Sequence, residues 1–270
     1  MPRKWTIDEE EHYRLELIGL YVEKNLSIRE IADHLNLSEK TIFQRLQRLG
    51  IKSTPQKKKH YLNKRNDICI PQVYSPELAE LFGVLLGDGH ITHFQLQVTL
   101  GDKELSYAKY VHRLVKTLFK GQPKISIRKQ GYWTVYLGST EVTQYLFKQG
   151  LVKNKVAAQV DVPKWILAEP KFYPHFIRGF FDTDGSVYAL KFGVQISFTN
   201  YSLPILKALH LMLQSLEYSP SKISHHKIYL TKRDDIERFF LEIQPKNIKH
   251  VKRYRSIKCV GTQAVNEGGL

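Results

Sequence analysis

Cysteine is scarce: Cys69 and Cys259 are the only two in 270 residues, and no CxxC pair is present. This scarcity excludes a disulfide framework and a cysteine-based structural zinc site, and it indicates a reducing compartment. No apolar run reaches the length of a transmembrane helix. The opening residues MPRKWTIDEEEHY contain no apolar signal-peptide core, and their acidic cluster argues against a transit peptide.

Acidic residues are also few, with 26 Asp and Glu against 41 Lys and Arg, and the net charge of +15 gives a pI near 9.6. Such an excess indicates a polyanionic partner, and nucleic acid is the first candidate. An anionic membrane is disfavoured, because no basic amphipathic helix stands out. The length allows a main domain and a small one.

The first 51 residues predict three helices. Residues 7–24 carry a helical apolar stripe, Ser27–Glu30 forms a capping box, and Ser38 begins a third helix that Gly50 ends. A short turn before the last helix resembles a helix-turn-helix domain. A small helical bundle that binds protein, or nothing, is the alternative.

A basic segment, residues 52–73, follows this domain and reads as a linker that lies along phosphates. A merely solvated linker remains open for each of its residues. The residues expected to contact DNA from the third helix and the linker are Lys40, Thr41, Gln44, Arg45, Arg48, Lys57, Lys58 and Lys59.

Two similar apolar runs, Leu78–Gly89 and His175–Gly185, both end in Asp-Gly. Read as helices, they place small residues four apart on one face, which lets two helix backbones approach closely. The final glycines fit a helix C′ position with positive φ. Asp88 and Asp184 then lie at two helix ends, beside unpaired carbonyls, where hard oxygen ligands suit Mg²⁺. A turn after an ordinary core helix would explain one copy but not two.

Matching patterns follow each run, 96 residues apart from Asp88 to Asp184. Period-two strands with one polar face come first, then a helix, two further strands and a last helix. Asp102 and Asn200 are expected to cap the two middle helices. The fold class is therefore α+β, with two pseudo-symmetric αββαββα repeats. The expected later strands are Lys124–Arg128 with Trp133–Leu137, and Lys222–Ser224 with Lys227–Thr231.

The doubled motif resembles the LAGLIDADG homing endonucleases in their single-chain, two-motif form. The two copies of the nonapeptide are Leu81–Gly89 and Ile177–Gly185. The resemblance implies a saddle-shaped sheet that lies in a DNA major groove, with the motif helices at the centre. It covers an endonuclease domain at 74–258, with repeats 75–160 and 172–258, and leaves a tail at 259–270.

By this resemblance Asp88 and Asp184 are the metal-binding and catalytic acids, and the carbonyls of Gly87 and Thr183 also reach the metal. The cofactor would be Mg²⁺, or Mn²⁺. Gly83 and Gly179 would lie at the helix interface. The first copy departs from the pattern at its sixth place, where Leu86 replaces the acid that the second copy keeps as Asp182.

The family also places a basic residue near each acid. We expect Lys155 and Lys249 in this role, with Lys153 and Lys252 as alternatives, and ordinary phosphate contact remains open for all four. The expected groove-reading residues, whose alternative is a plain solvent-facing strand position, are Gln95, Gln97, Thr99, Lys124, Arg128, Gln195, Ser197, Thr199, Lys227 and Tyr229.

The sequence thus predicts a site-specific, metal-dependent double-strand DNA endonuclease, acting as a monomer in the cytoplasm and associated with the nucleoid. An organellar origin stays open. The alternatives are a non-cleaving DNA-binding transcriptional regulator and an RNA maturase that binds intron RNA. An intein is disfavoured, because the chain starts with Met1-Pro2 and lacks a His-Asn end.

Overall fold

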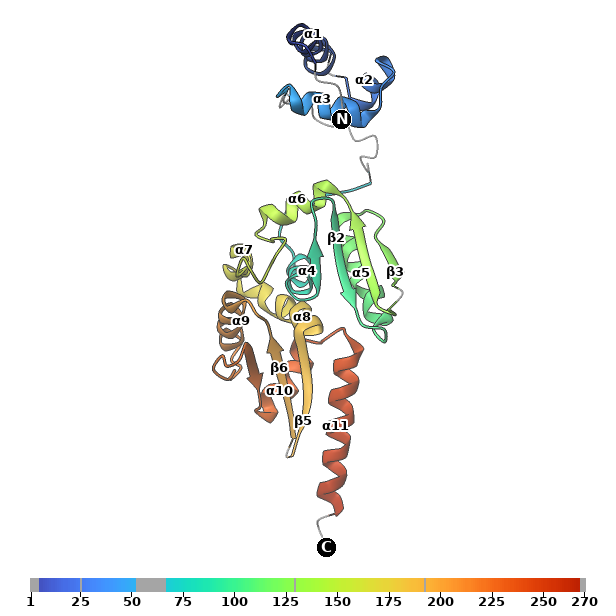
Figure 1. Cartoon of the computed structure of the whole chain (residues 1–270). Coiled ribbons are helices and arrows are strands. Elements are labelled where there is room, and N and C mark those ends of the chain that lie inside the picture. Colours follow the sequence, from blue (N-terminus) through green and yellow to red (C-terminus); the bar gives the residue numbers. More distant parts are fainter. Residues whose placement is uncertain (1–4, 25, 52–66, 129, 192, 268–270) are drawn as a thin grey trace. The chain divides into compact units, whose positions relative to one another are not determined.

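The computed structural model describes residues 5–24, 26–51, 67–128, 130–191 and 193–267, with backbone alone for 259–267. The chain divides into two compact units, Met1–Asn63 and Lys64–Leu270, shown in Figure 1. Among the described helices, none combines the length and the apolar character needed to cross a membrane.

The small unit is helical, as predicted. Its elements are α1 (Ile7–Ile18), a π-helical turn (Gly19–Glu23), α2 (Ile28–His34) and α3 (Glu39–Arg48). The capping box of Ser27 and Glu30 is confirmed, and Ser38 caps α3 by accepting a hydrogen bond from the Thr41 N–H. The apolar stripes of these helices close one core that contains Leu17, Ile31, Ile42 and Leu46.

The large unit is built around two crossing helices, α4 (Pro76–Leu86) and α8 (Tyr173–Asp184), which lie at its centre in Figure 1. Their contact confirms the prediction from the small residues. A Cβ on Gly83 would lie 2.3 Å from the Phe176 carbonyl oxygen, and one on Gly179 would lie 2.1 Å from the Glu80 carbonyl oxygen. The two backbones therefore touch, and only glycine fits at either position.

The expected positive φ at Gly89 and Gly185 is wrong. Gly185 has φ −86° and begins a strand, and Gly89 also begins a strand without positive φ. The requirement for glycine is steric instead. A Cβ would lie 2.4 Å from Leu85 Cα at Gly89 and 2.3 Å from the Phe181 carbonyl oxygen at Gly185. Each chain turns back tightly against its own motif helix.

The first repeat has the predicted order αββαββα. After α4 come β1 (Gly89–Ile91), β2 (Gln95–Leu100), α5 (Leu105–Phe119), β3 (Lys124–Ile127), β4 (Trp133–Gly138) and α6 (Thr140–Lys148). The antiparallel sheet has the order β1-β2-β4-β3. Leu96, Val98 and Leu100 face the core, so the alternate residues of β2 face outward as predicted.

The second repeat follows the same plan with one strand fewer. Its elements are α8, β5 (Gly185–Leu190), β6 (Gly193–Thr199), α9 (Leu203–Ser215), β7 (Lys227–Leu230) and α10 (Arg233–Glu242). The predicted strand Lys222–Ser224 is wrong: Ser224 makes an isolated bridge to Lys227 and belongs to no named strand. The seven described strands form two separate sheets, of four and three strands, where the resemblance implied one saddle-shaped sheet.

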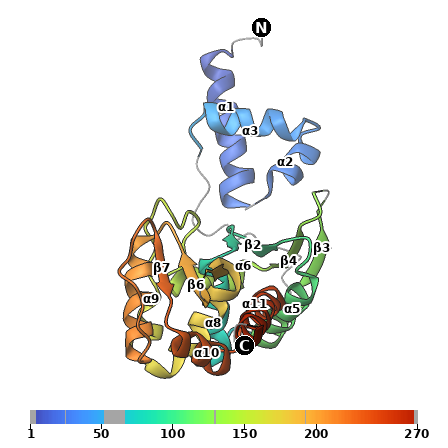
Figure 2. The same ribbon diagram turned by 90° about the horizontal axis from the view of Figure 1, so that it is seen from below.

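Three further elements were not predicted. A short helix α7 (Lys164–Leu167) and a 3₁₀ turn (Pro170–Phe172) connect the repeats. The expected tail is instead part of a 20-residue helix, α11 (Ile248–Glu267). Seen from below in Figure 2, α11 lies between α10 and α5, and its end points toward the viewer.

Candidate active site at the two helix ends

The two motif aspartates lie beside each other at the crossing of α4 and α8. Asp88 follows the C-cap residue Gly87, and Asp184 is the last residue of α8. A Cβ on Gly87 would lie 3.2 Å from Asp184 Oδ1, so the second carboxylate reaches the end of the first helix. Burial, opposed in part by Asn200 and reinforced by the Asp88 charge, raises the pKa of Asp184 to about 7.

The Asp88 carboxyl is more open to solvent, but the surrounding protein still raises its pKa by desolvation. The charge of Lys249 opposes this rise and that of Glu104 adds to it. The negative charge of one carboxylate raises the pKa of a neighbouring one. A nearby cation offsets this rise and favours ionisation of both. Such a pair is suited to binding a divalent metal.

Lys155 approaches the pair from the loop after α6. Its Nζ donates to the carbonyl oxygens of Leu85 at 2.9 Å and Leu86 at 3.0 Å, and also to that of Gly87. The ammonium thus caps the C-terminal end of α4, where the helix dipole favours a cation. Burial lowers the pKa of Lys155, while the charges of Asp184 and Asp88 act in the opposite direction.

Lys249 approaches from the first turn of α11, and a different partner holds it. Its Nζ lies 2.8 Å from Glu104 Oε1, and its side chain is 43% exposed. Glu104 stands at the N-cap of α5, in the other repeat. The charges of both expected lysines act on Asp88 and Asp184. The alternatives Lys153 and Lys252 are exposed, as Lys249 is.

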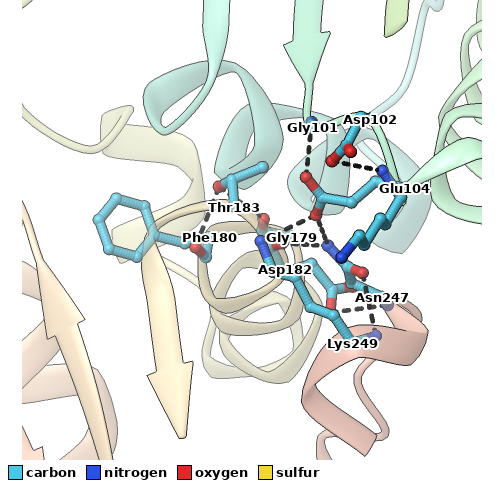
Figure 3. A network of polar contacts seen from close by, with 10 residues as sticks. Gly101, Asp102, Glu104, Gly179, Phe180, Asp182, Thr183, Asn247 and Lys249 are labelled. Atoms are coloured by element: carbon cyan, nitrogen blue, oxygen red, sulfur yellow. Dashed lines mark hydrogen bonds and ion pairs between the residues drawn. The ribbon is translucent and has the colours of Figure 1, made fainter. Parts of the chain in front are cut away.

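A buried polar network anchors the base of α11 (Figure 3). Asp182 accepts hydrogen bonds from the backbone N–H groups of Lys246 at 2.9 Å and Asn247 at 3.0 Å. The Asn247 amide donates to Glu104 Oε1 and to the Asp182 carbonyl oxygen. Glu104 Oε2 also accepts from the Gly101 N–H at 2.7 Å. These contacts fix the start of α11, and hence Lys249, to both repeats.

The prediction that Asp102 caps α5 is wrong: Glu104 is the N-cap residue, and its side chain makes no capping hydrogen bond. Helix α5 begins at Leu105 rather than at Lys103. The Asp102 carboxylate accepts from the N–H of its neighbour Lys103, and its carbonyl oxygen accepts from the Trp133 indole. Asn200 does accept from the Ser202 N–H at 2.8 Å, but Ser202 is the N-cap residue of α9. The amide of Asn200 donates to Asp184 Oδ2 at 2.7 Å. The sequence pattern gave no signal for this second bond.

The site suits a metal that needs few protein ligands. The described residues contain no cluster of three or more His, Cys, Asp or Glu side chains able to hold an ion. Mg²⁺ is commonly bound by one or two carboxylates together with water and substrate phosphates, so Asp88 and Asp184 fit it. The Gly87 carbonyl oxygen, an expected ligand, accepts a hydrogen bond from Lys155. The Thr183 hydroxyl donates to the carbonyl oxygens of Gly179 and Phe180 in its own helix.

A hollow of about 510 Å³ opens beside Asp184. Tyr188 and Thr199 line it from the sheet, and Lys249 and Arg253 line it from α11. One carboxylate and two cations thus face the same solvent space, a combination that suits an anion bound together with a metal.

The outward faces of both sheets carry most of the predicted groove-reading residues. In the first sheet Gln97 lies opposite Tyr136, which lies opposite Lys124. Thr199 lies opposite Lys227 in the second sheet. Three further residues of this outward face were not predicted as groove-reading residues: His90, Ser126 and Tyr136. Their place on the face depends on the register between strands, which the sequence pattern does not show.

Ser197 is an exception, since it is fully buried. Ser197 lies opposite Ser186, and both serines interact with the phenol of Tyr188. Among the other predicted positions of the two sheets, Arg128 donates to Thr134, and the rest are exposed or half-buried: Gln95, Gln97, Thr99, Lys124, Gln195, Thr199, Lys227 and Tyr229.

In the small unit, two of the predicted DNA contacts are engaged within the unit itself. The Arg45 guanidinium lies 4.5 Å from the Tyr13 ring centroid, and that of Arg48 lies 4.3 Å from the Trp5 ring. Lys40 and Gln44 are exposed, and Thr41 contacts the Ser38 hydroxyl at 2.8 Å. The predicted contacts Lys57, Lys58 and Lys59 lie outside the described residues.

Residues 171–244 match the family model of the LAGLIDADG-like domain. This segment includes α8 and its Asp184 and runs through α10, so the match covers most of the second repeat. A protein described as replication factor C small subunit, from Methanocaldococcus jannaschii, is 32% identical over 115 residues. That match covers 42% of this chain but only 6% of the relative's length.

Solved structures of similar fold include the N-terminal LAGLIDADG domain of DUF199/WhiA, at 17% identity and TM-score 0.46, over 64% of this chain and 86% of that one. The homing endonuclease I-WcaI bound to its DNA recognition sequence gives 15% identity and TM-score 0.48, over 66% and 85%. I-DmoI in complex with DNA and Mn gives 17% identity and TM-score 0.43, over 62% and 96%. At these scores the likenesses do not define this chain's function.

Proposed function

We propose that this protein is a metal-dependent, site-specific endonuclease that cuts both strands of duplex DNA. The observation that carries the proposal is the pair Asp88 and Asp184 at the crossing of α4 and α8, with one lysine approaching from each repeat. The LAGLIDADG-like match of residues 171–244 supports it. The charge of +15 supports a nucleic acid as the partner.

Asp88 and Asp184 are the residues that would hold Mg²⁺ or Mn²⁺. When bound, such a metal activates water for attack on a phosphodiester and stabilises the leaving oxygen. The protein's own groups orient this site. Asn200 fixes one oxygen of Asp184, and Lys155 holds the end of α4. Lys249 presents a positive charge toward the hollow beside Asp184, where a phosphate would gain from it.

We assign recognition of the DNA base sequence to the outward faces of the two sheets. Gln97 and Gln195 have amides that can pair with adenine, and Lys124 and Lys227 can donate to guanine. The small helical unit is proposed to add a second DNA contact through Lys40 and Gln44, in the manner of a helix-turn-helix domain. The monomeric state belongs to the same proposal, because one chain supplies both aspartates.

The test is a selection of cleaved duplexes from a random or genomic DNA library, with Mg²⁺ and with EDTA. The proposal predicts metal-dependent recovery of one long target site. Enrichment of bound but uncut DNA would favour a non-cleaving regulator, and preferential binding of a host intron RNA would favour a maturase. Asp234→Asn, an exposed aspartate on α10, is the charge-matched control for variants of the two motif acids.

A further inference from the structure

The part of α11 whose side chains are described, Ile248–Lys258, is strongly basic on its outer side. It contains five Lys and Arg residues and no acidic residue. Lys249, Lys252, Arg253 and Arg255 are all exposed. Because a helix places residues three and four apart on one side, these cations form a continuous stripe along it.

The inner side of α11 is attached to the second repeat. His250 is buried against the Phe181 ring, at a centroid distance of 4.7 Å. Tyr254 stacks on Phe240 of α10 at 4.0 Å. The helix therefore has a fixed rotation about its axis, and its basic side is held away from the core.

The stripe begins at the candidate active site. Lys249 at its base pairs with Glu104, and Arg253 lines the hollow that also contains Asp184. Figure 1 shows α11 running from the motif helices past the tip of β5. A charged stripe that starts where the scissile phosphate would lie, and then leads outward, is suited to follow a phosphate chain.

We propose that α11 binds the sugar-phosphate backbone of duplex DNA beyond the cleavage position, through Lys252 and Arg255. The surface is additional to the sheet faces and to the small helical unit. The inference rests on the proposed function only in taking DNA as the partner. It requires no cleavage, because phosphate contacts contribute affinity without reading sequence.

The test uses the full chain and a short duplex of fixed arbitrary sequence, with affinity measured over a range of salt concentrations. The variant Lys252→Gln/Arg255→Gln removes two charges from the stripe. Its control, Lys109→Gln/Lys116→Gln, removes two charges from exposed positions on α5, the helix that packs on the core face of the first sheet. Arg253 and Lys249 stay unchanged because they line the site.

We expect the α11 variant to reduce the slope of log affinity against log salt by about two, and the control to leave it near the wild-type value. On the selected target, which is a second substrate for this test, hydroxyl-radical footprints of the α11 variant should shorten on one side of the site only. An unchanged slope in the α11 variant, or an equal fall in the control, would overturn the proposal. Neither outcome would contradict DNA binding or cleavage by the protein. A larger loss on duplex RNA than on DNA would also overturn it. Failure of wild type to cut its selected target would instead reject the endonuclease and leave this binding test intact.

Discussion

The two repeats place the same chemical groups at the centre but support them differently. In the second repeat Asp182 is buried and accepts two backbone N–H groups from the segment that begins α11. In the first repeat Leu86 stands at the matching motif position, and the Lys155 ammonium binds the end of α4 instead. The two motif helices therefore end in different contacts, one held by a carboxylate and the other by an ammonium group.

The supporting groups of the aspartates differ as well. Asp184 is fixed by the Asn200 amide, while Asp88 is more exposed and lies near the charges of Glu104 and Lys249. Lys155 is half-buried, whereas Lys249 is 43% exposed and tied to Glu104. These differences predict two half-sites of unequal strength, and each experiment below probes one of them.

The largest effect should come from the acids. Asp88→Asn and Asp184→Asn should each lower cleavage of at least one strand by about 10³-fold, because a carboxylate that holds the metal is lost. DNA binding should stay nearly intact, since the change removes negative charge. Strand-resolved gels with end-labelled target measure this. Wild-type rates in both variants, with Asp234→Asn as control, would refute the site.

Much of this site could be predicted from the sequence because its signals are local. The doubled apolar run with Asp-Gly located both motif helices, their glycine contacts and both aspartates. The network of Asp182, Asn247 and Glu104 could not be predicted, because Asn247 and Glu104 are 143 residues apart and no local pattern links them. Helix α11 was missed for a related reason: its apolar side is short, and packing on Phe181 and Phe240 stabilises it.

The next largest effect concerns the crossing that joins the repeats. Gly179→Ala should destabilise the large unit by about 3 kcal/mol, because its Cβ would meet the Glu80 carbonyl oxygen at 2.1 Å. The control is Gly138→Ala in β4, where the nearest atom would lie 4.0 Å away. Urea unfolding of both variants measures the difference. Equal midpoints for the two would contradict the close helix contact.

A smaller effect is the pH dependence of the second repeat. Burial lowers the pKa of His250 to about 4, so the unfolded chain takes up this proton first as pH falls. The contribution of His250 to stability should therefore decline below about pH 6.5, by about 2 kcal/mol at pH 5. The raised pKa values of Asp182 and Asp184 act in the opposite direction.

The His250 contribution can be isolated by difference. The stability of His250→Phe minus that of wild type should rise as pH falls from 7.5 to 5, because the variant lacks the titrating group. The exposed His93→Phe is the control for replacing a histidine by phenylalanine. A pH-independent difference for His250→Phe would mean that the imidazole is not held neutral in the fold.

The smallest effect tests how Lys249 is held. Glu104→Gln removes the charge that pairs with Lys249. It keeps one acceptor oxygen, which serves Asn247 when the new NH₂ group replaces the oxygen that accepts from the Gly101 N–H. We expect about a tenfold loss in the cutting rate of one strand, with the other strand nearly unchanged. Asp102→Asn, two residues away and exposed, is the control. Equal losses on both strands would point to a general loss of fold.

The most direct test of the account is the cleavage rate of each strand of the selected target by the wild-type protein in Mg²⁺. Two aspartates with unequal support predict that both strands are cut, at different rates, and that EDTA stops both. Binding of that target without cleavage of either strand in Mg²⁺ would contradict the assignment of Asp88 and Asp184 as a hydrolytic metal site.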